Sequence, residues 1–280
     1  MRIKRRFTFS EREKNIIKFL EKQKVEYIIA HNIGVLEIFE DDDKYVEISQ
    51  YLAKNNIKPN PATSQCIYTK QELDDAKWLI LGSTWHNGYP QPQGYLSYVE
   101  KTYDVSGCCK ECYAGKVQND SFVLKKPPKW GRRNFFALTV VYDEFFISDK
   151  ARSVFIKNNV TGIEYKNVLH GLKKREVIED TKQIFVKNRL RPGLAEGMIA
   201  QNFICPKCDS VNHLLNVGFF NYYKQAFEGV IVDVIKTSEY CGTEGMGSSL
   251  VFVTQRLRKI IIDNGLENGV YFIPVQMVCN

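Results

Sequence analysis

The spacing of apolar side chains predicts helices and strands in alternation over the first third of the chain. Apolar residues recur at helical spacing from Ile16 to Leu20, directly after Ser10-Glu-Arg-Glu13, which has the pattern of a capping box. The β-branched and aromatic residues from Val25 to Ala30 predict a strand, and the acidic run that follows Phe39 favours a second helix over Tyr45–Lys54. This part of the chain is therefore expected to mix both kinds of element.

One more helix, a strand and a loop are predicted before residue 95. Thr69-Lys-Gln-Glu72 repeats the capping-box pattern and predicts a short helix that ends near Ala76. The apolar run Trp78–Gly82 predicts a buried strand. The next segment, Ser83–Gly94, is a loop rich in aromatic residues and proline, so it either packs over the core or forms an edge that binds a partner.

The second part of the chain contains an internal repeat, in which residues 146–168 match residues 252–275 with one inserted residue. Ser148 and Thr254 are expected to cap the two helices, and Asn159 and Gly265 suit the left-handed position that ends them. The apolar faces of these helices include Val154, Phe155, Ile260 and Ile261. Each helix is followed by a β-rich stretch, so both copies predict the same strand-helix-strand design.

Each copy of the repeat is preceded by a CxxC pair, which makes the duplicated unit larger than one helix. We therefore predict an α+β fold, with an N-terminal α/β part followed by two related α+β modules. The predicted domains are an N-terminal region over 1–105, a first CxxC module over 106–168, a basic connector over 169–202 and a second CxxC module over 203–280.

The two CxxC pairs, Cys109-Lys-Glu-Cys112 and Cys205-Pro-Lys-Cys208, predict a structural zinc site. Zinc prefers four ligands in a tetrahedron, and the two-residue spacer allows both sulfurs of a pair to face one point. The 92 residues between the pairs exceed an ordinary zinc-ribbon spacing, but related modules can bring their CxxC turns together. The alternatives are inert reduced thiols, two separate sites, or thioredoxin-like redox pairs.

The other four cysteines have no partner spacing and are interpreted as free thiols. They are Cys66, Cys108, Cys241 and Cys279. Because Cys108 is adjacent to Cys109, it could take the place of Cys109 as a ligand.

Composition and charge narrow the class of protein. The 280 residues are 44% hydrophobic, which is enough for a large core, and the longest apolar runs fall well short of the roughly 18 residues of a membrane span. The first residues are basic but no apolar stretch follows them, so a secretion signal is not expected and we predict a cytoplasmic protein. The net charge of +7 arises after residue 104, where 24 basic residues face 17 acidic ones. Mixed charge of this kind is typical of solvated loops, or of a surface that contacts nucleic acid or an acidic protein.

Motifs for catalysis are absent from the sequence. It contains no GxGxxG, GxxxxGK[ST] or GxSxG pattern, and none of its four histidines stands in a metalloprotease, triad or deaminase spacing. Enzymatic activity therefore stays open but is not favoured.

Several segments together resemble the bacterial double-CxxCG motif proteins. They are the two CxxC turns, ISDKARSVFIKNNVTGIEY, DVIKTSEY and the closing VTQRLRKIIIDNGLENGVYFIPV, and the resemblance extends weakly to WLILG and GYPQP. The C-terminal unit is also similar to one found in polymorphic-toxin immunity proteins. Tyr113 and Asp209 stand where the family motif has glycine. The resemblance implies a zinc-stabilised α+β protein, with immunity to a toxin as one role, and implies no catalytic residues.

These observations lead to three hypotheses. The first is a zinc-stabilised protein-binding module, in its narrowest form an immunity protein that neutralises a bacterial toxin. Its binding face is predicted to include Trp85, Tyr89, Trp130, Arg132 and Arg133. The second is a nucleic-acid-binding zinc protein, because KKPPKWGRR combines positive charge with an aromatic side chain. The third is a thiol redox enzyme.

Overall fold

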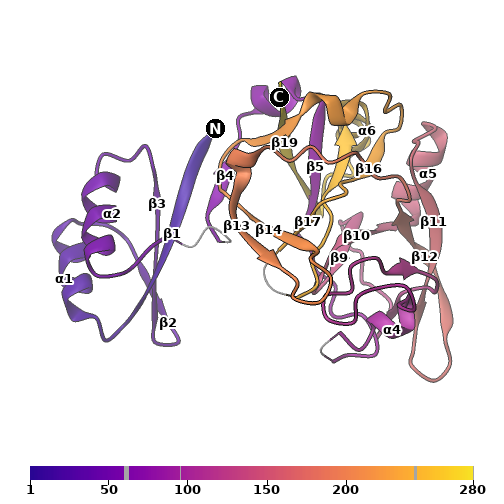
Figure 1. Ribbon diagram of the computed structural model, residues 1–280, viewed down its shortest axis with the longest axis horizontal. Helices are drawn as coiled ribbons and strands as arrows, with labels where there is room; N and C mark the ends of the chain where they lie inside the picture. Colours follow the sequence, from indigo (N-terminus) through magenta and orange to yellow (C-terminus); the bar gives the residue numbers. More distant parts are fainter. Residues whose placement is uncertain (60–62, 95, 243–244, 280) are drawn as a thin grey trace. The chain divides into compact units, whose positions relative to one another are not determined.

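The computed structural model describes residues 1–280 except 60–62, 95, 243–244 and 280, and it confirms an α+β fold (Figure 1). The contacts divide the chain into two compact units. The first unit comprises residues 1–72 and 215–219, and the second comprises residues 73–214 and 220–280. The predicted boundary at residue 105 and the modules after it lie within the second unit, apart from residues 215–219 of the second CxxC module, and the predicted module bounds stay a prediction.

The first unit is a four-stranded sheet with two helices. In order across the sheet the strands are β2 (Ile28–Ala30), β3 (Ile33–Phe39), β1 (Arg2–Ser10) and β4 (Gln65–Ile67), and the helices are α1 (Lys14–Lys22) and α2 (Tyr45–Lys54). Helix α2 has the predicted bounds. Its buried residues join Phe7, Phe9, Leu20 and Leu36 in one apolar core. Gly34 is required there, because a Cβ atom would lie 2.2 Å from the ring of Phe9.

The two predicted capping boxes differ in outcome. Thr69 and Glu72 form the complete box, since the Glu72 amide donates to the Thr69 hydroxyl over 3.2 Å and the Thr69 amide donates to the Glu72 carboxylate over 2.8 Å. Helix α3 (Lys70–Asp75) begins there. At the first box the Ser10 amide donates to Glu13, but the Ser10 hydroxyl accepts from Arg12, and α1 begins only at Lys14. Residues 10–13 thus form a tight turn between β1 and α1, and Ser10 does not cap the helix.

The second unit is built on two five-stranded sheets with the same strand order. The first sheet runs β8 (Val123–Leu124), β11 (Glu164–His170), β12 (Glu176–Phe185), β10 (Val141–Ser148) and β9 (Phe135–Leu138). The second runs β15 (Phe220–Tyr223), β19 (Val270–Val278), β5 (Trp78–Ser83), β18 (Val251–Thr254) and β16 (Val234–Lys236). In both, only the first pair of strands is parallel.

The two copies of the repeat exchange their central strands. After the first CxxC pair come β8, β9, β10, α5 and β11, and after the second pair come β15, β16, β18, α6 and β19, in the same order along the chain. We call these two sets of elements the first half and the second half of the unit. Strand β5 precedes the first CxxC pair but lies in the sheet of the second half, whereas β12 precedes the second CxxC pair and lies in the sheet of the first. The segment predicted as a basic connector, 169–202, therefore supplies a central strand.

The helices of the repeat have the predicted ends. Helix α5 (Asp149–Lys157) is capped by Ser148, and α6 (Gln255–Asp263) by Thr254; each hydroxyl accepts a backbone amide over 3.2 Å. Asn159 and Gly265 follow them with φ of 49° and 61°. Local capping therefore sets both helix ends in the way the sequence predicts.

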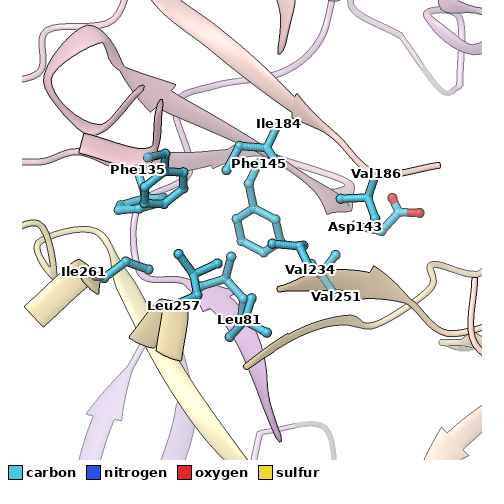
Figure 2. A pocket seen from close by; sticks show the side chains of 12 residues that line it. Leu81, Phe135, Asp143, Phe145, Ile184, Val186, Val234, Val251, Leu257 and Ile261 are labelled. Carbon is cyan, nitrogen blue, oxygen red and sulfur yellow. The ribbon is translucent and has the colours of Figure 1, made fainter. Parts of the chain in front are cut away.

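A single apolar core joins the two sheets and both helices. Figure 2 shows the side chains that meet there, with Phe135, Phe145 and Ile184 from the first sheet and Leu81, Val234 and Val251 from the second. The cavity among them has a volume of about 10 Å³. Because its lining is almost wholly apolar and a water molecule needs about this much space together with polar partners, this cavity is a packing defect and not a ligand site.

Short elements complete the second unit. They are α4 (Val99–Thr102), β6 (Tyr103–Asp104), β7 (Val117–Gln118), β13 (Ile199–Ile204), β14 (Val211–Leu215), β17 (Tyr240–Cys241) and two 3₁₀ turns at Glu196–Met198 and Lys224–Phe227. The pairing β6–β7 places one CxxC turn at the end of a hairpin, and β13–β14 does the same for the other. Among the described residues, no helix combines the length and the apolar character needed to cross a membrane.

Candidate metal centre

Two short turns of similar geometry carry the four cysteines. In the first turn the amide of Tyr113 donates to the carbonyl of Cys109 over 2.9 Å, and in the second the amide of Asp209 donates to the carbonyl of Cys205 over 3.0 Å. Each turn is closed by a return hydrogen bond from the first cysteine amide, to Ala114 in one case and Ser210 in the other. This closure holds both thiols of a pair on the same side of the turn.

The two turns bring all four sulfurs into one cluster. Their Sγ atoms lie within 4.8 Å of one another. Two sulfur contacts cross between the turns, with 3.8 Å between the Sγ atoms of Cys109 and Cys205 and 3.6 Å between those of Cys112 and Cys208. A tetrahedral zinc ion with bonds of about 2.3 Å to sulfur requires sulfurs about 3.8 Å apart. The donor set and its spacing therefore fit a metal ion of this size.

The positions where the double-CxxCG motif has glycine adopt the conformation that favours glycine. Tyr113 and Asp209, the residues after each second cysteine, have φ of 54° and 59°. L-residues with a Cβ atom reach this left-handed region at a cost, which asparagine and aspartate bear more easily than others. Both turns thus have a backbone that glycine would adopt at a lower cost than the residues present.

The surroundings act in opposite directions on two of the thiols. Hydrogen bonds from the amides of Cys112 and Glu111 lower the pKa of the Cys109 thiol to about 7. Burial raises the pKa of the Cys112 thiol to about 12. Thiolates are the form that binds a metal, so an ion here displaces protons from the cluster.

The remaining cysteines stand outside this cluster. The thiol of Cys108 donates to the carbonyl of Val105 over 3.4 Å, and that of Cys66 donates to Gly218 over the same distance. Cys109, and not its neighbour Cys108, is therefore the residue placed to bind a metal. Burial raises the pKa of Cys241 to about 12, which makes it a poor nucleophile, and Cys279 is exposed.

Three of the five residues predicted to bind a partner lie together, two tryptophans that pack inwards and an exposed arginine that covers one of them. The ring of Trp85 contacts the edge of Trp130 at 5.6 Å between centroids, and the guanidinium of Arg133 lies 4.8 Å over Trp85. The indole nitrogen of Trp130 donates to Thr181 over 3.3 Å. Both tryptophans pack against the core, so this part of the Ser83–Gly94 loop covers the core as one of its two interpretations predicted. Tyr89, Arg132 and Arg133 are exposed, and their role in binding stays a prediction.

A buried polar network connects the two halves and was missed in the sequence. The ammonium of Lys236 on β16 lies 2.6 Å from the carboxylate of Glu144 on β10, and both side chains are at most 5% exposed. Gln183 on β12 donates to the same carboxylate over 2.8 Å and exchanges hydrogen bonds with Gln118. The sequence does show one charged residue inside each of two apolar strand patterns. It does not show that these two residues pair with each other.

Comparisons with known proteins add no relative to this description. No family model matches the chain, and no curated protein matches its sequence. The resemblance to the double-CxxCG motif proteins therefore depends on the quoted segments alone and stays a prediction.

Proposed function

We propose that Cys109, Cys112, Cys205 and Cys208 bind one structural zinc ion, in a protein whose role is to bind another protein. The closed cluster of four sulfurs carries the first part of this proposal, because its separations match those of a tetrahedral zinc site. Four thiolates leave no open position for a substrate or water. The ion would join the hairpins of the two halves.

Metal binding accounts for the cysteines better than redox chemistry does. A redox CxxC pair forms its disulfide within the motif and stands at the start of a helix. Here sulfur contacts of 3.8 Å and 3.6 Å also run between the two motifs, and each motif lies at the end of a β-hairpin. This arrangement favours four ligands to one ion over two separate dithiols.

The scaffold suits a protein that presents one fixed surface. Three independent connections hold the two halves together: the cysteine cluster, the exchanged strands β5 and β12, and the buried pair of Lys236 and Glu144. Binding to a rigid surface costs little conformational entropy. The resemblance to toxin immunity proteins makes a bacterial toxin the narrowest form of the partner.

The alternative of nucleic-acid binding has less support. Its main argument was an aromatic side chain within a basic stretch, which could stack on a base. Trp130 is that residue, and its indole is packed against Trp85 and Phe136 and hydrogen-bonded to Thr181. Stacking would require it to leave this position.

Elemental analysis of protein purified without chelator tests the metal. One zinc per chain is expected, and Cys112→Ser/Cys208→Ser is expected to lose it together with stability, because metal-binding energy contributes to folding. Cys108→Ser/Cys279→Ser removes the same number of thiols outside the cluster and serves as the matched control. Protein with no metal, or a control variant that also loses it, would contradict the assignment.

Co-expression tests the partner. The protein is expected to restore growth to cells that produce the toxin encoded beside its gene, and to co-purify with that toxin. The Cys112→Ser/Cys208→Ser variant is expected to protect less, because a destabilised scaffold presents less of the folded surface. If no neighbouring gene encodes a toxin, or the toxin remains active in the presence of the protein, the immunity role is refuted.

A further inference from the structure

Two basic segments that are far apart in the sequence meet at one end of the first sheet. Strand β8 runs parallel to β11, with Leu124 opposite His170, and the amide of Gly171 donates to the carbonyl of Leu124 over 3.2 Å. Parallel strands end at the same edge, so Lys125 and Lys126 continue beside the turn over residues 171–175. We define the basic tip as Lys125, Lys126, Leu172, Lys173, Lys174 and Arg175.

Charge and exposure distinguish the basic tip from an ordinary loop. All six of its side chains are exposed. Lys174 and Arg175 pair with Glu176 and Asp120, at 3.0 Å and 2.7 Å. For the three other lysines the described part of the chain offers no ion pair. The tip thus has a net positive charge that the protein itself does not neutralise.

The basic tip also exposes an apolar side chain in a well-defined turn. Leu172 is 64% exposed and is flanked by lysines in sequence. Gly171 has φ of 82°, and a Cβ atom there would lie 2.8 Å from the carbonyl of Lys174, so the turn requires glycine. Figure 1 shows this connection between β11 and β12 projecting beyond the strands of the second unit. A projecting leucine surrounded by cations matches an apolar pocket with an acidic rim.

We infer that the basic tip is the docking site for an acidic protein partner, with Leu172 entering an apolar pocket of that partner. This inference rests on the proposed protein-binding function and names the surface and the partner's chemistry. A protein is favoured over nucleic acid for two reasons. No aromatic side chain belongs to the tip, and its centre is apolar, whereas strands of nucleic acid are held by cationic grooves with stacking aromatics.

Fluorescence anisotropy with defined probes tests the docking site on the full-length protein. The first probe is a fluorescein-labelled peptide of glutamate, glycine and leucine, and the second is a single-stranded oligonucleotide of equal net charge. Lys125→Ser/Lys173→Ser/Lys174→Ser is expected to weaken peptide binding about tenfold, since exposed charge pairs contribute modestly and add up. Leu172→Asn is expected to weaken binding of this peptide but not of one in which serine replaces leucine.

The matched control removes three exposed lysines from helix α1, as Lys14→Ser/Lys18→Ser/Lys22→Ser, and is expected to bind the peptide within about twofold of the native protein. Equal loss in both triple variants would overturn the inference, because binding would then follow net charge alone. Tighter binding of the oligonucleotide than of the peptide at the same salt concentration would overturn it as well. Zinc content is measured on every variant, so a failed metal site is recognised separately from a failed docking site.

Discussion

The buried ion pair between Lys236 and Glu144 leads to a prediction whose magnitude follows from its surroundings. Lys236→Met removes the charge that lies 2.6 Å from the carboxylate of Glu144, which is 4% exposed and has no other ion pair among the described residues. Breaking a buried pair from one side typically costs about 3–5 kcal/mol. We expect the free energy of unfolding of the second unit to fall by about this amount at neutral pH.

A double variant distinguishes the cost of leaving a buried charge unpaired from the cost of losing the lysine side chain. In Lys236→Met/Glu144→Gln neither charge of the pair remains, and the glutamine keeps an oxygen that can accept from Gln183. Asp143, which lies 3.8 Å from Lys236 and is 13% exposed, loses its cation in both variants, so its effect cancels when the two are compared. We expect the double variant to be more stable than Lys236→Met alone, because replacing both members of a buried pair is often nearly neutral. Lys187→Met is the control, since its pair with Glu164 lies at the surface and is worth at most about 1 kcal/mol.

The dependence on pH provides an independent check of the same reasoning. Burial raises the pKa of Glu144, and Lys236 opposes that effect. Without the lysine, the pKa in the folded state rises further above its unfolded value of about 4.3. A raised acid pKa destabilises the folded state at higher pH, so the deficit of Lys236→Met should shrink as the pH falls from about 7 to 5.

Urea unfolding followed by tryptophan fluorescence is the appropriate assay. All three tryptophans, Trp78, Trp85 and Trp130, belong to the second unit, so the signal reports on the unit that contains the pair. The reasoning is refuted if Lys236→Met costs no more than the surface control, or if the double variant is less stable than the single one.

Two further predictions concern single side chains. Asp233 accepts hydrogen bonds from Thr161, Thr254 and Arg256, and these bonds hold its pKa below the usual value in spite of burial. In urea unfolding, Asp233→Asn should therefore lower the free energy of unfolding by about 2 kcal/mol at pH 7 and by progressively less below about pH 4. An equal cost at all pH values would contradict this. At the exposed Asp209, with φ of 59°, glycine should be neutral or stabilising by up to about 1 kcal/mol, and valine should lower both stability and zinc retention; the reverse order would refute the role given to the turn.

The sequence determined the parts of this protein that depend on neighbouring residues. Helix α2 has its predicted bounds, and Ser148 and Thr254 cap their helices as predicted, because caps and helical periodicity are set by contacts three or four residues apart. The capping box predicted at Ser10 is the exception. The pairing of β1 with β3 extends to Ser10, so a contact with a distant strand sets the turn there.

The cysteine cluster was accessible to sequence reasoning for a different reason. The spacing within each CxxC pair is local, and the repeat indicated that two distant pairs belong to equivalent positions, which the structure brings within 4.8 Å. The identity of the ion depends on its own chemistry as well, so zinc is a proposal and the cluster is a finding.

Only the tertiary structure decided which strands occupy the centres of the two sheets. β5 and β12 are equivalent in the repeat, and either could pair within its own half; the exchange between halves depends on long-range hydrogen bonding and packing that leave no local pattern. The same holds for Lys236 and Glu144, 92 residues apart, and for the two basic segments of the tip. Each of these charged groups is ordinary in its own segment, and its significance arises from the residues that folding places beside it.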